Sequence, residues 1–146
     1  MSIKEGDTLP KTQFITMTDD GPQPVDFDQF FKGRKVVVFA LPGAFTRTCS
    51  AKHLPGFVAQ ADAILAKGVD EIACISVNDA MVMNAWGLAH EAPGKVTMLS
   101  DGNCDLTAAL GLDSDMSARG YGRRSKRYAM IVEDGVVKGI VTGEMG

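Results

Sequence analysis

The chain has few cysteines and no recognisable metal-binding pattern, and both facts limit the classes of protein to which it can belong. Its 146 residues include three cysteines, two histidines and one tryptophan. An odd number of widely spaced cysteines does not form the framework of a disulfide-stapled domain. The sequence also lacks a CxxC pair and a Cys/His cluster with zinc spacing. We therefore expect neither a metal nor another cofactor.

Long apolar runs and strong net charge are missing as well. No stretch approaches the roughly 18 consecutive apolar residues of a membrane-spanning helix, and the first residues lack the apolar centre of a signal peptide. A net charge of -3 gives no general reason to bind nucleic acid or an anionic membrane. We expect a cytoplasmic protein folded as one domain over residues 1–146, a length that buries a sizeable core without disulfides.

Apolar patterning predicts alternating strands and helices. Continuous apolar runs predict central strands at 35–41, 71–77 and 95–101. Helices are expected at about 49–67, 79–90 and within 103–112, with a helical turn at 28–33 and with Pro55 kinking or dividing the first helix. Hairpins are expected from 13–18 with 24–27 and within 127–141. This order predicts an α/β fold, a mixed sheet with helices on both faces, which the thioredoxin-like arrangement fits.

Cys49 lies where the first central strand gives way to a helix. Ligands of α/β proteins collect beyond the carboxyl ends of the strands, and the first turn of a helix favours an anion. A thiolate is such an anion, so this place lowers the pKa of a cysteine and suits a nucleophile. The alternative is a small buried core residue, the commonest fate of a lone cysteine.

The residues around Cys49 strengthen the functional interpretation. Thr46, three residues earlier, can bring its hydroxyl beside the sulfur across one helical turn. Pro42 stiffens the entry to the loop and Gly43 permits a sharp turn. His53, four residues later, suggests the Cys–His pair of a thiol protease. Because the sequence singles out no orienting partner and no oxyanion hole, we interpret His53 as structural or pocket-lining.

The octapeptide PGAFTRTC, residues 42–49, resembles the peroxiredoxin active-site motif Pro-x-x-x-Thr-x-x-Cys. CSAKHLPGFV, IACISVNDAMVMNAWG and RSKRYAMIVEDGVVK resemble the type II branch, which includes the animal fifth peroxiredoxin. The resemblance runs from about residue 3 to residue 138. It implies a thioredoxin-like fold and a thiol peroxidase that reduces hydrogen peroxide and organic hydroperoxides. The alternative is a peroxide-sensing or chaperone-like redox protein that uses the same cysteine.

The resemblance also implies roles for individual residues. Cys49 would be the peroxidatic cysteine, whose thiolate attacks the peroxide and becomes a sulfenic acid. Thr46 would hydrogen-bond the sulfur and the peroxide, and Pro42 would shield the sulfur from water. The arginine of the family falls on Arg127, whose guanidinium would favour the thiolate and stabilise charge as the O–O bond breaks. From the rest of the basic segment 119–127 we expect mostly exposed side chains, at Arg123, Arg124 and Lys126.

Four further residues are weaker candidates. Phe45 and Trp86 are expected at the pocket wall, although a plain core position is as good an interpretation of Trp86. Cys74 sits in a predicted central strand, so we expect a buried, inert thiol. Cys104 opens a short helix, where a mildly reactive, exposed thiol is expected without any activating neighbour. These two are the secondary thiols that could meet an oxidised Cys49.

Two departures from the resembled family bear on function. Arg47 stands where relatives carry proline or a small residue; it either strengthens the positive field or is a solvated surface side chain. The chain stops at GIVTGEMG, without the family's last helix and without the tail that holds the resolving cysteine of the animal relative. We therefore expect an external reductant, either glutathione with glutaredoxin or thioredoxin. The resemblance also implies a homodimer with Phe45 and the glycine-rich loop at 120–122 near the contact.

Overall fold

The computed structural model describes residues 2–46 and 54–142, and its centre is a mixed seven-stranded sheet in the order β2-β1-β5-β4-β3-β8-β9. The strands are β1 (Phe14–Thr18), β2 (Gly21–Val25), β3 (Lys35–Ala40), β4 (Glu71–Ser76), β5 (Thr97–Ser100), β8 (Tyr128–Glu133) and β9 (Val136–Thr142). β3, β4 and β5 run parallel, whereas β1 and β8 run antiparallel to β5 and β3. The predicted mixed sheet is confirmed.

Hairpins close both ends of the sheet, as the sequence predicts. The first is tighter than expected, because β2 already begins at Gly21, inside the segment predicted to be a turn. In the second, β8 and β9 are joined through Asp134 and Gly135, whose φ angles are 52° and 77°. Two successive residues with positive φ match the type I′ turn, whose twist suits a two-residue hairpin.

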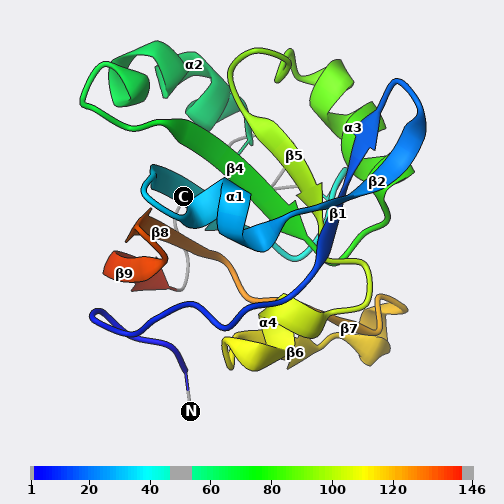
Figure 1. The fold of residues 1–146 in the computed structure, drawn as a ribbon. Helices are drawn as coiled ribbons and strands as arrows, with labels where there is room; N and C mark the ends of the chain where they lie inside the picture. Colours follow the sequence, from blue (N-terminus) through cyan, green and yellow to red (C-terminus); the bar gives the residue numbers. More distant parts are fainter. Residues whose placement is uncertain (1, 47–53, 143–146) are drawn as a thin grey trace.

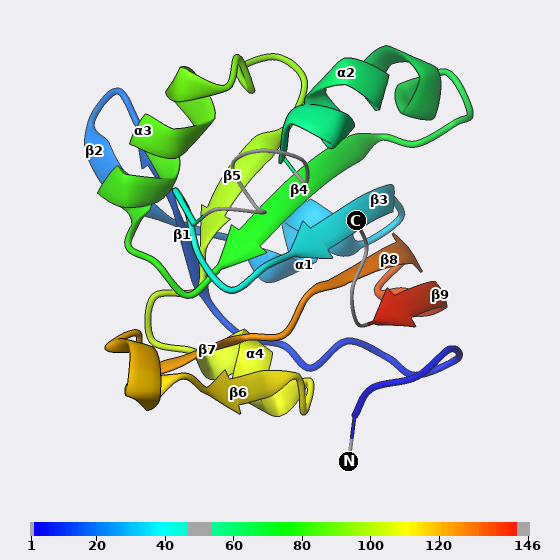
Figure 2. The ribbon, with the colours of Figure 1, turned by 180° about the vertical axis from the view of Figure 1, so that it is seen from behind.

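Helices cover both faces of the sheet, as expected. They are α1 (Phe27–Phe31), α2 (Leu54–Leu65), α3 (Ala80–Ala89) and α4 (Asp105–Ala109). Figure 1 shows α1 in front of the central strands, and Figure 2, seen from behind, shows it beyond them. α1 and α4 contribute to one buried cluster and α2 and α3 to another. Among the described residues, no helix is both long and apolar enough to cross a membrane.

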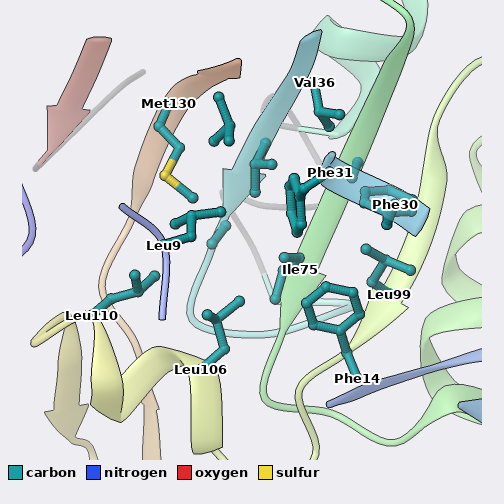
Figure 3. Close-up of a cluster of buried hydrophobic side chains, with 14 of the residues drawn as sticks. Leu9, Phe14, Phe30, Phe31, Val36, Ile75, Leu99, Leu106, Leu110 and Met130 are labelled. Atoms are coloured by element: carbon teal, nitrogen blue, oxygen red, sulfur yellow. The ribbon is translucent and has the colours of Figure 1, made fainter. Parts of the chain in front are cut away.

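The two apolar clusters explain why the middle strands have apolar residues at successive positions. Val36 and Val38 of β3 point into the cluster on the α1 side, whereas Phe39 points into the cluster on the α2 side. On the α1 side, Phe14 meets Phe30 edge-on at a centroid distance of 6.1 Å, surrounded by aliphatic side chains (Figure 3). A strand buried on both faces loses the usual apolar–polar alternation.

The starts of α2 and α3 bear on the sequence expectations in different ways. The described part of α2 begins at Leu54, one residue before Pro55, so the kink or division expected at Pro55 stays a prediction. The expected earlier portion, 49–53, lies outside the described residues. α3 is capped by Asp79, whose carboxylate accepts the backbone N–H of Val82 at 2.8 Å. Asn78, directly before this cap, makes other contacts.

A second, small sheet was not expected. β6 (Asp113–Asp115) pairs antiparallel with β7 (Arg123–Ser125), and both lie beside α4 at one end of the molecule in Figures 1 and 2. Three-residue strands are too short to show a convincing period in a sequence. The basic segment that we expected to be a mainly solvated run is therefore partly a strand.

Candidate functional site

Strand pairing gathers three distant segments at the loop that follows β3. In the antiparallel β3–β8 pair Ala40 faces Tyr128, so Arg127, directly before β8, lies at the end of β3. In the parallel β3–β4 pair Ala40 faces Ile75, so the residues just after β4 also lie at this end. The pairing therefore carries the start of β8 to the beginning of the PGAFT segment, although the two are far apart in sequence.

The loop of residues 42–46 turns sharply on itself. The backbone N–H of Thr46 points to the carbonyl oxygen of Gly43 at 3.4 Å, and the Thr46 hydroxyl donates to the same oxygen at 2.7 Å. Phe45, between them, has a φ of 62° and a side chain that is 55% exposed. A left-handed backbone at a bulky residue costs about 1–3 kcal/mol and persists only where surrounding contacts impose it.

The hydrogen bond of Thr46 sets its chemical role in this arrangement. A hydroxyl has one proton to donate, and Thr46 donates it to Gly43. Its oxygen keeps lone pairs that can accept a hydrogen bond from a protonated oxygen of a substrate. The predicted contact between Thr46 and the sulfur stays a prediction, because Cys49 lies outside the described residues.

Asn78 holds the middle of the loop from the β4 side. Its Oδ1 accepts the backbone N–H of Ala44 at 2.9 Å and the hydroxyl of Ser76 at 2.6 Å. Ser76 is fully buried, so this amide oxygen satisfies a donor that water does not reach. Asn78 is a site residue that the sequence-based predictions did not include. Its place two residues beyond the end of a central strand, where α/β sites collect, was the available signal.

Arg124 corrects the expectation that it is mostly exposed. It is half-buried, and its Nη1 donates to the carbonyl oxygen of Pro42 at 3.0 Å. Its Nε donates to the carbonyl oxygen of Tyr121 at 2.9 Å, and the guanidinium carbon lies 5.2 Å from the Tyr121 ring centroid. Successive residues of a strand face opposite sides, so Arg123 points outward to Asp113 while Arg124 points to the loop.

The structure describes some of the remaining predicted site residues and not others. Arg127, expected inside, is half-buried, and Lys126 is exposed as expected. Trp86 is fully buried in the α2–α3 cluster, with its ring centroid 6.4 Å from that of Phe45, so it belongs to the core and also borders the loop. The predictions for Arg47, Cys49 and His53 fall on residues that the structure does not describe.

The two other thiols are poorly placed for redox chemistry. Cys74 is fully buried in β4, between Phe39 and Met98 of the neighbouring strands, which confirms its predicted burial. Cys104 is partly buried rather than exposed. Burial, followed by the negative charges of Asp101 and Asp113, raises the pKa of the Cys104 thiol. A raised pKa leaves less thiolate near neutral pH, so Cys104 is a weaker nucleophile than an ordinary cysteine.

The gathered groups define what this end of the sheet can do. Arg124 and Arg127 bring positive charge to a loop whose backbone is fixed by Asn78 and by its own turn. Positive charge with an accepting hydroxyl suits a reaction in which an anionic nucleophile meets a small hydroxyl-bearing substrate. Within residues 2–46 and 54–142, no three His, Cys, Asp or Glu side chains are grouped so that they could hold a metal ion.

Comparison with known proteins identifies relatives over nearly the whole chain. The redoxin family profile matches residues 4–146. The chain is 50% identical over 145 residues to the chloroplastic peroxiredoxin-2E-2 of Oryza sativa subsp. japonica, covering 94% of this chain but only 63% of that relative. It is 45% identical over 133 residues to peroxiredoxin-2C of the same organism, covering 90% of this chain and 82% of the relative. The crystal structure of reduced Prx3 from Vibrio vulnificus in complex with H2O2 matches with a TM-score of 0.92 and 48% identity, covering 97% and 89% of the two chains.

Proposed function

The chain belongs to the peroxiredoxin family, and from that premise we propose that it is a thiol-dependent peroxidase with Cys49 as its nucleophile. The thiolate sulfur forms a bond to one peroxide oxygen while the O–O bond breaks. The cysteine is oxidised to a sulfenic acid, the peroxide is reduced, and the departing oxygen takes a proton and leaves as water or an alcohol.

The observation that carries the proposal is the convergence of the motif loop with the start of β8. The β3–β8 register supports a site that contains both Thr46 and Arg127. In that site Thr46 accepts a hydrogen bond from the peroxide, and the Arg127 guanidinium favours the thiolate and the charge that develops on the leaving oxygen. Pro42, at the head of the loop, shields the sulfur from bulk water.

An external thiol completes the cycle in this proposal. Among the described cysteines, Cys74 is fully buried and Cys104 has a raised pKa, so neither is well suited to attack a sulfenic acid. Glutathione with glutaredoxin is the first candidate reductant and thioredoxin the second. Steady-state peroxide reduction with each NADPH-coupled system, measured side by side, distinguishes them.

Substitution of single cysteines tests the assignment. We expect Cys49→Ser to abolish turnover of hydrogen peroxide and of an organic hydroperoxide, while Cys104→Ser, the matched control, keeps most of it. Activity that survives in Cys49→Ser would refute the assignment. Rapid mixing of the reduced wild type with peroxide separates an enzyme from a sensor, because a sensor that reacts slowly would show oxidation without comparable turnover.

We also propose a homodimer formed through the face that carries Phe45. Phe45, Met81 and Leu88 are 55%, 56% and 59% exposed, and the last two lie seven residues apart, on one side of α3. Large apolar side chains left exposed favour an interface, and this proposal takes the loop and this side of α3 as the two parts of the contact. Sedimentation of Met81→Glu should show a smaller species than the wild type, whereas Val141→Glu, equally apolar and exposed on β9, should not. Equal behaviour of the two variants would rule this face out.

A further inference from the structure

The guanidinium of Arg124 fills the space that a side chain at position 43 would need. A Cβ atom added to Gly43 would lie 2.5 Å from Nη1 of Arg124 and 3.3 Å from Cγ2 of Thr46. Gly43 does not have the positive φ that reserves a position for glycine. Its backbone would therefore accept alanine, and the close approach of the guanidinium is what a side chain here would disturb.

The guanidinium of Arg124 is oriented before it reaches the loop. Its Nε is held by the carbonyl of Tyr121, and its plane lies near the Tyr121 ring. Because a guanidinium is planar and rigid, fixing Nε also fixes the direction in which Nη1 donates. That direction leads to the carbonyl oxygen of Pro42. The small β6–β7 sheet thus reaches the head of the loop through one side chain.

Charge pairing does not account for this placement. Arg123, the neighbour on the same strand, forms a salt bridge with Asp113 at 2.5 Å. No carboxylate of the described residues lies within salt-bridge distance of Arg124, which contacts two backbone carbonyls and one ring. A half-buried cation that bonds to backbone groups of a loop is suited to holding that loop.

We propose that Arg124 is a positioning residue for the peroxidase reaction and that Gly43 is the small residue that admits it. By holding the Pro42 carbonyl, Arg124 fixes the start of the turn whose far end is Thr46, while Asn78 fixes its middle at Ala44. The inference rests on the proposed function, since it concerns how the groups around Cys49 are presented to a peroxide.

A double-mutant cycle tests the shared space. We expect Arg124→Ala and Gly43→Ala each to lower kcat/KM for hydrogen peroxide by roughly ten- to a hundredfold, the range that a displacement of about 1 Å in a catalytic site can cause. The double variant should be no worse than the more damaged single variant, because both changes remove the same contact. Losses that multiply in the double variant would overturn the proposal.

Two further variants separate positioning from general damage. Arg123→Ala removes a neighbouring arginine that faces away from the loop, so it should keep wild-type kcat/KM. Arg124→Lys should recover part of the activity, because an ammonium can reach the Pro42 carbonyl but cannot hold Tyr121 in the same fixed geometry. Each variant is assayed well below its own thermal midpoint. Wild-type activity in Arg124→Ala, or no difference between Arg124→Lys and Arg124→Ala, contradicts the role.

A readout that does not depend on activity keeps the two proposals apart. Trp86 is the only tryptophan, is fully buried and lies beside the Phe45 ring of the loop. Loosening the loop should therefore increase acrylamide quenching of Trp86 fluorescence in Arg124→Ala and in Gly43→Ala, but not in Arg123→Ala. If the wild type reduced no peroxide, the proposed function would fail, but quenching would still report whether Arg124 holds the loop. Unchanged quenching in both Arg124→Ala and Gly43→Ala would contradict the positioning role of Arg124, even in an active enzyme.

Discussion

Replacing Asn78 should damage both the stability and the chemistry of this protein, because one amide oxygen holds two donors from different segments. In Asn78→Ala, the backbone N–H of Ala44 and the hydroxyl of Ser76 both lose their acceptor. Ser76 is fully buried, so water does not replace the lost partner, whereas the Ala44 contact is only partly buried.

The size of the effect follows from these two contacts. A buried donor left without an acceptor costs about 1–3 kcal/mol, and an ordinary hydrogen bond contributes about 0.5–1.5 kcal/mol. The Ser76 hydroxyl also lies 3.4 Å from the carbonyl oxygen of Leu41 and can shift toward it, so we expect a total of about 2–3 kcal/mol. With an unfolding entropy of about 0.3 kcal/mol/K for a chain of this length, the melting temperature should fall by about 7–10 °C.

Asn78→Asp is the sharp comparison, because a carboxylate oxygen accepts both hydrogen bonds just as the amide oxygen does. Its free energy of unfolding should stay within about 1 kcal/mol of the wild type. The added negative charge beside the loop should nevertheless raise the pKa of Cys49. The pH midpoint of Cys49 alkylation in Asn78→Asp should then move upward. Asp79→Ala is a control that removes only the α3 cap, and it should lower the free energy of unfolding by about 1 kcal/mol.

Thermal unfolding and pH-dependent alkylation, measured on the wild type, Asn78→Ala, Asn78→Asp and Asp79→Ala, test these expectations. An Asn78→Ala variant that melts with the wild type would show that the two hydrogen bonds contribute nothing measurable. An Asn78→Asp variant as unstable as Asn78→Ala would show that the NH2 group of the amide, rather than its oxygen, is what the loop needs.

Two further changes test groups outside the loop. The Tyr128 hydroxyl is buried without a hydrogen-bond partner in the described parts of the chain, so Tyr128→Phe should leave stability unchanged or raise it by up to about 1 kcal/mol. A clear fall in the melting temperature would contradict this. Because burial and nearby carboxylates raise the pKa of Cys104, its alkylation, followed by mass spectrometry, should have a midpoint above the ordinary value of about 8.5. Since the folded state favours the neutral thiol, that contribution to stability is complete below the unfolded pKa and is lost as pH rises through the folded pKa. Cys104→Ser should reduce this alkaline loss, and a midpoint at or below the ordinary value would refute the assignment.

Much of the fold follows from local patterns that the sequence displays directly. Apolar runs predict β3 and β4, and the turn at Asp134 and Gly135 predicts the last hairpin, because strand and turn preferences depend on neighbouring residues. The small β6–β7 sheet could not be predicted in the same way. Its strands are three residues long, and their pairing depends on residues about ten positions apart along the chain.

The residues of the candidate site likewise fall into those that local sequence predicts and those that depend on tertiary contacts. The sequence by itself determined the motif with Cys49 and Thr46 and its position after a central strand, because spacing and residue type are visible in one short segment. Only the tertiary structure decided that Arg124 rather than Arg123 meets the loop, and that Asn78 grips Ala44 while Asp79 caps α3. Those choices depend on strand register and on contacts between segments tens of residues apart, where a single residue's shift reverses which side chain faces inward.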